Sequence, residues 1–403
     1  MSAAIESAAS GDRRARSNVF RLAAAQALAG ANASVVFATG AIIGSSLSPD
    51  PSLATVPISV FVVGMAAGTL PTGWLSRVYG RRAAFLAGGG CGVMAGLVGA
   101  AALLAQSFAL YCVATLFAGL YGSVVQSFRF AAADGTSAAF RPKALSWVMA
   151  GGVFSGVLGP QLVTWTMGLW SPNLFVVSYL AQAGVALVAM AVLSGVDLPR
   201  PVAADMARGR KLRDIVRQKP FIVAVVCGVV TYTLMNLLMT SAPLAMQMCL
   251  LPLSASNGAI QWHIVAMFAP SFFTGNLIAR FGAPRIVATG LLLTVCAAVS
   301  GLSGVTEAHF VVGLILLGLG WNFGFVGASA MVLETHRPEE RNKVQAFNDF
   351  LVFGTMAAGS FGSGHLLVAL GWAAVNWVVF PPVLLALLVL VGSGALRRRA
   401  VPV

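Results

Sequence analysis

The sequence predicts an all-α integral membrane protein made of transmembrane helices. The 403-residue chain is 58% hydrophobic and only 9% charged, whereas a soluble domain carries about 25% charged residues. Its mean hydropathy is +0.87. Apolar runs of about 20 residues recur along the whole chain, and a run of that length crosses the roughly 30 Å hydrocarbon core of a bilayer. Because lipid satisfies no backbone hydrogen bonds, each run is expected to be a helix.

About twelve such runs follow one another along the chain. They cover residues 19–46, 53–75, 83–105, 108–132, 144–168, 173–196, 220–246, 258–279, 285–304, 308–333, 344–368 and 372–394. The eighth run is the least apolar, because it contains Gln261, His263, Pro270 and Asn276.

A polar and basic segment, 197–219, separates the first half of the runs from the second. Residues 208–219 within it (RGRKLRDIVRQK) are expected to form an amphipathic helix on the cytoplasmic membrane surface. The predicted organisation is a cytoplasmic N-terminal tail at 1–18, a six-helix bundle at 19–196, a basic cytoplasmic linker at 197–219, a second six-helix bundle at 220–394 and a basic cytoplasmic tail at 395–403.

Of the 25 Lys and Arg residues, all except Arg129 lie in the two tails, in alternate gaps between the runs, or in the first three residues of a run that borders such a tail or gap. This pattern follows the positive-inside rule and predicts that both termini are cytoplasmic. The net charge of +13 is split among short segments, so we do not expect nucleic-acid binding; the cations face anionic lipid headgroups instead. These segments carry Arg13, Arg14, Arg16 and Arg21; Arg77, Arg81 and Arg82; Arg141 and Lys143; Arg200, Arg208, Arg210, Lys211, Arg213, Arg217 and Lys219; Arg280 and Arg285; Arg337, Arg341 and Lys343; Arg397, Arg398 and Arg399.

The five cysteines are scattered through or beside the runs, without a CxxC pair. They are expected to be small buried hydrophobes. We expect no metal site and no cofactor.

The two halves of the chain contain matching motifs. DGTSAAFRPK, from Asp134 to Lys143, aligns with ETHRPEERNK, from Glu334 to Lys343: in both, an acid precedes an Arg by seven positions. GWLSRVYGRR, which begins at Gly73, likewise aligns with GNLIARFGAPR, which begins at Gly275. Two matches in the same order indicate a duplicated six-helix unit.

With these motifs the chain resembles the major facilitator superfamily. In that family the loop after the second span reads G-x-L-x-D-R-x-G-R-R, and this chain has Gly73, Leu75, Gly80, Arg81 and Arg82 in register, with Arg77 in place of the acid. The resemblance implies two six-helix bundles and a cytoplasmic charge latch that separates when that side opens; simple loop anchoring is the alternative. The candidate latch residues are Arg77, Arg81, Arg82, Asp134, Arg141, Glu334, Arg341 and Asp349.

The fifth run contains GGVFSGVLGP, which ends at Pro160. It resembles part of a Gly-Pro motif that is common in antiporters of the family, although the glycines expected after the proline are missing. Close helix packing explains such glycines equally well, so both interpretations stay open.

The resemblance also implies a central cavity lined by the first, fourth, seventh and tenth spans. Polar and aromatic side chains on these runs are the candidate substrate ligands, and Arg129 is a functional candidate because an ionised residue inside a span is costly. The candidates are Arg129, Gln126, Asn236, Tyr232, Trp321, Asn322 and Gln26.

Arg129 has three competing interpretations. Its guanidinium is a fork of donors that would bind an anionic or polar substrate, or it pairs with Asp349, the acid well inside the eleventh run, or its head snorkels to the interface. Asp349 and His263 are the candidates for proton coupling.

The predicted function is secondary transport of a small organic solute by alternating access in a bacterial inner membrane, by a monomer. A membrane-embedded enzyme is disfavoured, since the chain has no HExxH, no GxSxG and no paired intramembrane carboxylates. QSFRFAAADG, NLLMTSAPLAM and AMFAPSFFTG resemble a bacterial subgroup that includes riboflavin importers; drug or metabolite efflux is the rival. The substrate, its direction and the coupling ion, including protons, stay open.

Overall fold

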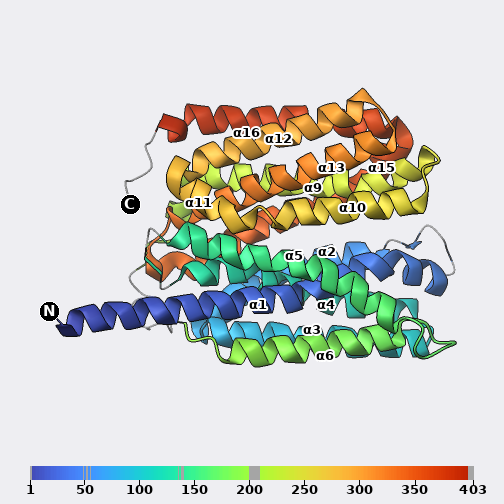
Figure 1. Cartoon of the computed structure of the whole chain (residues 1–403), viewed down its shortest axis with the longest axis horizontal. Helices are drawn as coiled ribbons and strands as arrows, with labels where there is room; N and C mark the ends of the chain where they lie inside the picture. Colours follow the sequence, from blue (N-terminus) through green and yellow to red (C-terminus); the bar gives the residue numbers. More distant parts are fainter. Residues whose placement is uncertain are drawn as a thin grey trace. The chain divides into compact units, whose positions relative to one another are not determined.

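The computed structural model describes residues 2–48, 50, 53–54, 56–134, 136–137, 140–198 and 209–397, and these residues are almost entirely helical, with no strand among them. The chain divides into two compact units (Figure 1). Unit 1 comprises Met1–Gly209 together with Gln345–Phe350, and unit 2 comprises Arg210–Val344 and Leu351–Val403. The chain therefore leaves unit 1 at Gly209, inside the predicted linker.

Unit 1 contains a helix over each of the first six predicted runs. The helices are α1 (Ser2–Leu47), α2 (Val56–Val78), α3 (Arg81–Leu104), α4 (Phe108–Ala133), α5 (Arg141–Thr166) and α6 (Val176–Ser194). α1 is helical from Ser2, within the predicted tail 1–18, and the candidate membrane span in α1 begins at Ala15. Its first residues, SAAIESAAS, are rich in alanine, which has the highest helix propensity.

Unit 2 contains the remaining helices. They are α8 (Leu212–Val216), α9 (Lys219–Met248), α10 (Leu253–Phe268), α11 (Ser271–Phe281), α12 (Ala283–Ser303), α13 (Glu307–Trp321), the π-helix η2 (Asn322–Val326), α14 (Gly327–Leu333), the 3₁₀ turn η3 (Pro338–Glu340), α15 (Arg341–Trp377), α16 (Phe380–Gly392) and η4 (Ala395–Arg397). Residues Gln345–Phe350 of α15 group with unit 1.

The linker helix is much shorter than predicted. Instead of 208–219 it covers Leu212–Val216, and Arg208 lies outside the described residues. Gln218 is extended and begins α9, which has Pro220 in its first turn. Because proline fits the first turn of a helix but not its interior, Pro220 starts a new helix rather than continuing α8.

Ten helices in the described part of the chain are long and apolar enough to cross a membrane. The pair α10 and α11, bent by 42° at a short break, would make an eleventh. The break falls in the predicted eighth run, at Pro270. The predicted run 344–368 is helical within α15, but it is not among these candidates, so a count of twelve crossings stays a prediction.

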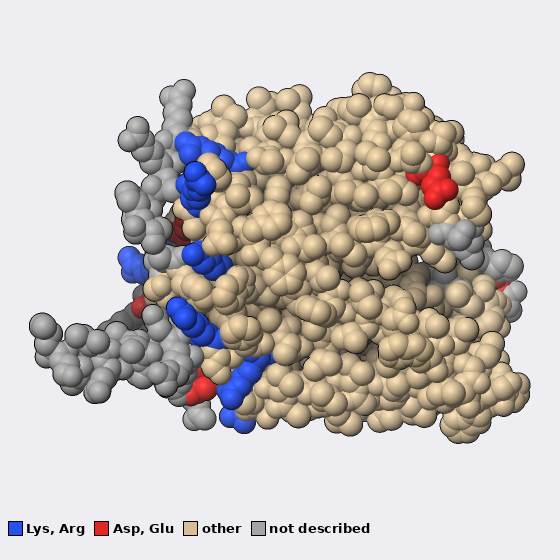
Figure 2. Space-filling model, in the orientation of Figure 1, with Lys and Arg blue, Asp and Glu red and all other residues tan. Residues whose placement is uncertain are grey.

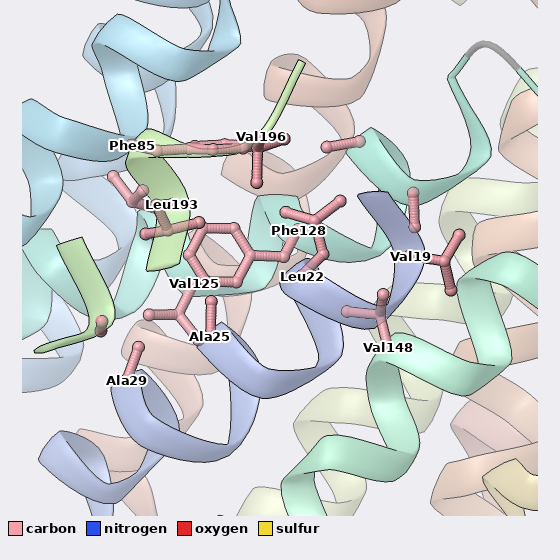
Figure 3. Close-up of a cluster of buried hydrophobic side chains, with 14 of the residues drawn as sticks. Val19, Leu22, Ala25, Ala29, Phe85, Val125, Phe128, Val148, Leu193 and Val196 are labelled. Atoms are coloured by element: carbon pink, nitrogen blue, oxygen red, sulfur yellow. The ribbon is translucent and has the colours of Figure 1, made fainter. Parts of the chain in front are cut away.

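The core of unit 1 is a cluster of fully buried side chains from five helices (Figure 3). Leu22 of α1, Phe128 of α4 and Val148 of α5 meet there. Phe85 of α3 packs edge-on against Phe128, with ring centroids 4.8 Å apart. This cluster packs the start of α3 against the end of α4, next to the charged residues described below.

One glycine turn recurs in both units. Gly80 precedes α3 with φ 89°, and Gly282 precedes α12 with φ 85°. Side chains rarely adopt this left-handed region, so glycine is needed at both turns. These two glycines are aligned in the sequence repeat, and their shared backbone conformation agrees with a duplicated unit.

Two glycines of the fifth run, Gly151 and Gly159, are explained by packing. A Cβ added at Gly151 would lie 2.4 Å from the carbonyl oxygen of Ala23, and one at Gly159 would lie 2.4 Å from Cβ of Ser34. Both contacts are with α1, so α1 and α5 approach each other at these glycines. The motif therefore has a structural role whether or not it also relates to antiport.

Candidate functional site

Arg129 is buried completely and forms an ion pair. It lies on α4, in the last two turns of the helix, and its Nη2 donates to Oδ1 of Asp349 at 2.5 Å. The exposed fractions of the two side chains are 0% and 5%. Asp349 belongs to the segment of α15 that groups with unit 1. The head group of Arg129 does not reach the surface, so the geometry favours pairing over snorkelling.

The rest of the Arg129 guanidinium is also occupied. Its Nη1 donates to the backbone carbonyl of Gln126 and lies 3.4 Å from Oε1 of the same residue. The guanidinium carbon is 4.4 Å from the ring centroid of Phe130. Asn348 donates a hydrogen bond to Oδ1 of Asp349 at 3.0 Å. A desolvated ion pair requires this kind of additional hydrogen bonding to offset the loss of water.

A second arginine, Arg81, hydrogen-bonds to α15 one helical turn before Asp349. Nε of Arg81, the first residue of α3, donates to Oδ2 of Asp134 at 2.6 Å. Its Nη2 donates to Oε1 of Gln345 at 2.5 Å. Asp134 follows the last residue of α4, where the helix dipole disfavours an anion, so the guanidinium of Arg81 compensates that charge. The family motif has an acid at the position of Arg77. In this chain Asp134 supplies the carboxylate that pairs with Arg81.

Gln345 and Asp349 lie four residues apart and therefore share one face of α15. They accept hydrogen bonds from Arg81 and Arg129 respectively. We call these five residues, Arg81, Arg129, Asp134, Gln345 and Asp349, the arginine network. It joins α3 and α4 to a short stretch of α15 within unit 1.

The other candidate latch residues lie outside this network. Arg77 and Arg82 are exposed, and neither forms an ion pair with a described residue. Arg141 and Glu334 are exposed and Arg341 is half-buried. The residues of the predicted latch therefore fall into two groups. One is the buried arginine network, and the other consists of the remaining cations and Glu334, which are exposed or half-buried.

Two contacts are not evident from the sequence alone. Gln345 is uncharged, and only its spacing from Asp349 indicates it. The sequence repeat aligns Glu334, not Glu340, with Asp134, so it does not indicate Glu340. Glu340 is buried and accepts a bidentate pair from Arg210, with Nη2 to Oε2 at 2.6 Å and Nε to Oε1 at 2.8 Å. This hydrogen-bonded arginine lowers the pKa of the Glu340 carboxyl to about 2.

Unit 2 contains an aromatic cluster centred on Tyr232 of α9. The ring of Tyr232 meets Trp321 at 5.6 Å, Phe325 at 4.9 Å and Phe353 at 5.2 Å between centroids, in each case edge to face. Trp321 and Phe325 stack at 5.2 Å. The indole N–H of Trp321 is buried without a hydrogen-bond partner among the described residues. Two predicted cavity residues, Tyr232 and Trp321, are thus brought together.

Asn322 stabilises the bend between α10 and α11. Its Nδ2 donates to the Met267 carbonyl and to Oγ of Ser271, each at 2.6 Å, and its Oδ1 accepts from Oγ1 of Thr274 at 2.6 Å. Asn322 opens the π-helix η2, and such bulges often occur at functional sites. The amide of this predicted cavity residue is therefore already engaged in joining α10, α11 and η2.

The remaining polar candidates are also buried. Gln26 is 4% exposed and Asn236 is 6% exposed, while Gln126 is half-buried. Nδ1 of His263 lies 2.7 Å from the Leu314 carbonyl, and its Nε2 has no partner among the described residues. Because a carbonyl only accepts, Nδ1 carries the proton and Nε2 is left as a free acceptor.

The described residues hold no group of His, Cys, Asp and Glu side chains that would bind a metal ion. On the face shown in Figure 2, charges of either sign are rare, and in each unit the visible Lys and Arg side chains gather at one end of the helices. This placement agrees with the charge pattern of the gaps.

The chain was compared with known proteins. It is 45% identical to the riboflavin transporter RfnT of Brucella anthropi over 380 residues, which cover 94% of this chain and 96% of that protein. It is 29% identical to the uncharacterized MFS-type transporter YdeG of Bacillus subtilis, over 89% of this chain and 88% of that one.

Solved structures show the same fold at low identity. The E. coli fucose:proton symporter FucP matches with a TM-score of 0.70 and 13% identity, over 94% of this chain and 98% of that chain. The proton:xylose symporter XylE matches with a TM-score of 0.72 and 12% identity, over 94% and 95%. The predicted fold class, and transport rather than catalysis, are confirmed. The model of the Major Facilitator Superfamily matches residues 22–259 and 252–402, and the chain belongs to this family of multi-pass membrane secondary transporters.

Proposed function

We propose that this protein transports riboflavin across a bacterial inner membrane by alternating access, as a monomer with both termini in the cytoplasm. The observation that carries the proposal is the 45% identity to the riboflavin transporter RfnT across 94% of this chain. The strings that resemble a riboflavin-importing subgroup point to the same substrate.

The chemistry of unit 2 suits a flavin. The isoalloxazine ring is planar and polar at its edge, and aromatic side chains stack on such rings while N–H groups bond the edge. Trp321 and Tyr232 supply aromatic rings, which are buried. Trp321 also supplies an N–H group, because its indole N–H lacks a partner among the described residues. In unit 1, α4 carries no acid within its span, so a strongly cationic substrate is not favoured.

The arginine network is the proposed switch of the transport cycle. A buried pair such as Arg129 and Asp349 holds α15 against α4 as long as it is intact, and its separation would free α15 to move. A substrate or a proton that competes for Asp349 would then drive the change, since a ligand shifts an equilibrium only through differential affinity. His263, with its free Nε2 acceptor, is the second proposed proton acceptor.

Counterflow in proteoliposomes tests the substrate. Vesicles that contain the purified protein and are loaded with unlabelled riboflavin should accumulate labelled riboflavin transiently, and protein-free vesicles should not. No counterflow with riboflavin, together with no thermal shift by riboflavin, FMN or FAD, would exclude flavins and leave efflux of another metabolite or drug as the rival. Repeating the assay with an imposed pH gradient of either sign reports direction and proton coupling.

A matched pair of tryptophan variants tests the ring-binding role. Trp321→Leu should weaken riboflavin counterflow at least fivefold, because stacking on an aromatic ring contributes about 1–3 kcal/mol per base-like ring. Trp262→Leu, on the same unit but with a side chain 58% exposed, should leave it within about twofold. An equal effect of the two variants would remove the aromatic cluster from the substrate site.

A further inference from the structure

The C-terminal part of the linker is fixed to unit 2 by an ion-pair clamp. Glu340 is fully buried and receives hydrogen bonds from Nε and Nη2 of Arg210 and from its backbone N–H, at 2.6–2.8 Å. A further backbone N–H, from Arg337, reaches Oε2 of Glu340 at 3.0 Å. Bidentate pairing fixes orientation as well as distance, so the chain at Arg210 has a defined position on the loop between α14 and α15.

Two more contacts extend this clamp. Nη2 of Arg210 lies 3.3 Å from the Thr335 carbonyl, and the ammonium of Lys343 donates to the Arg210 carbonyl. Five residues further on, Ile215 of α8 is 0% exposed. The linker segment is therefore held at two points, one ionic at Arg210 and one apolar at Ile215.

Between and after these two points the segment presents cations to the outside. Lys211, Arg213, Arg217 and Lys219 are all exposed, and none of them forms an ion pair with a described residue. Arg213 and Arg217 are each two residues from Ile215, so they project from the opposite side of the short helix. One acid, Asp214, lies among the four cations. We call these four residues the linker patch.

We propose that the linker patch binds the headgroups of anionic phospholipids and that the Arg210–Glu340 clamp holds it in the binding position. Charge complementarity carries the assignment, because exposed cations beside the start of a transmembrane helix attract anionic lipid. Lys219 is the first residue of α9, so the patch begins where a span begins. At the repeat position of Glu340 the first half of the chain has Phe140, whose side chain cannot accept these hydrogen bonds.

Two double variants of equal charge test the patch. The full chain, purified in non-ionic detergent, is titrated with dioleoylphosphatidylglycerol, and the rise in Tm gives an apparent affinity; dioleoylphosphatidylcholine is the zwitterionic comparison. Arg213→Gln with Arg217→Gln should weaken the phosphatidylglycerol response about 25-fold, at roughly fivefold per cation. Arg280→Gln with Arg285→Gln removes the same charge from exposed cations at the turn between α11 and α12; because these cations are not on the clamped segment, their loss should weaken the response less than threefold.

For the clamp, the expected change in lipid response is opposite to the change that net charge alone would cause. Glu340→Gln removes a negative charge, so a response set by net charge alone would increase. If the clamp positions the patch, the response to phosphatidylglycerol should instead decrease at least fivefold while the folded protein retains a cooperative thermal transition.

The proposal has defined contrary results. It is overturned if wild-type protein shows no preference for phosphatidylglycerol over phosphatidylcholine, if both double variants lose the response equally, or if inorganic phosphate at matched ionic strength reproduces it. An unchanged or stronger response in Glu340→Gln would overturn the role of the clamp.

Discussion

The guanidinium of Arg129 and the carboxylate of Asp349 depend on each other, because both are buried. Removing one partner of a buried ion pair leaves an uncompensated charge and costs about 3–5 kcal/mol, whereas apolar residues of similar size in both positions are often neutral. Stability and gating can therefore be separated at this pair.

Single and double substitutions make that separation. Arg129→Met or Asp349→Leu alone should lower the unfolding free energy by about 3–5 kcal/mol. The double variant should recover most of the stability but not transport, if the pair is the switch. Thermal unfolding and riboflavin counterflow are measured on the same preparations. Additive losses in the double variant would mean that the two residues do not form one unit.

The carboxyl group of Glu340 should make the stability of the folded protein depend on pH. Its pKa is lowered from 4.5 to about 2 in the folded protein. A depressed carboxyl pKa contributes stability that is present above about pH 4.5 and is lost as the pH falls toward 2. Thermal unfolding between pH 6 and 2 should therefore show a steeper loss for wild type than for Glu340→Gln; parallel curves would contradict the assigned pair.

At the scale of elements, the bend between α10 and α11 depends on a neighbouring helix. Asn322 makes three hydrogen bonds to this bend, each 2.6 Å long. Asn322→Ala removes these three buried hydrogen bonds, each of which contributes about 0.5–1.5 kcal/mol. The matched control is Asn276→Ala, since Asn276 lies on α11 and is exposed. Denaturation in detergent should show a clear loss for Asn322→Ala and almost none for the control.

The two glycine turns give another prediction about elements. Gly80→Ala and Gly282→Ala should each cost about 1–2 kcal/mol, because alanine is strained at positive φ. Gly184→Ala in α6 should be neutral or stabilising, since nothing lies within 4 Å of an added Cβ there and alanine favours helix. Comparable losses at all three positions would show that flexibility, not the left-handed conformation, matters.

Hydropathy predicted the helices well because each crossing must satisfy its own backbone. Charge position likewise singled out Arg129 and Asp349, since an ionised residue in an apolar run is visible without a structure. Gln345, Glu340 and the engagement of Asn322 could not be predicted, because each depends on which helix is its neighbour. The predicted helix 208–219 was wrong for a different reason: Gln218 is extended and Pro220 lies in the first turn of α9, so α8 is limited to Leu212–Val216.

For the whole molecule, the number of crossings is the open quantity that topology mapping can measure. If 344–368 crosses the inner membrane and Arg337 is cytoplasmic, Leu370, which is 67% exposed, lies on the periplasmic side. Leu370→Cys in a cysteine-free background should then react with an impermeant maleimide in intact cells, whereas Arg337→Cys should react only after lysis. Labelling of Leu370→Cys only after lysis would mean that 344–368 does not cross the membrane. The number of crossings would then be lower by one, and the C-terminus would lie on the other side of the membrane.

The spacing of Gln345 and Asp349 has a mechanical consequence. Both acceptors lie on one stripe of α15, so a rotation of that helix about its own axis would withdraw them from Arg81 and Arg129 at the same moment. Neither arginine could keep its bond while the other lost its own. The contact between these helices should therefore be two-state, with both hydrogen bonds formed or both broken, rather than weakening gradually.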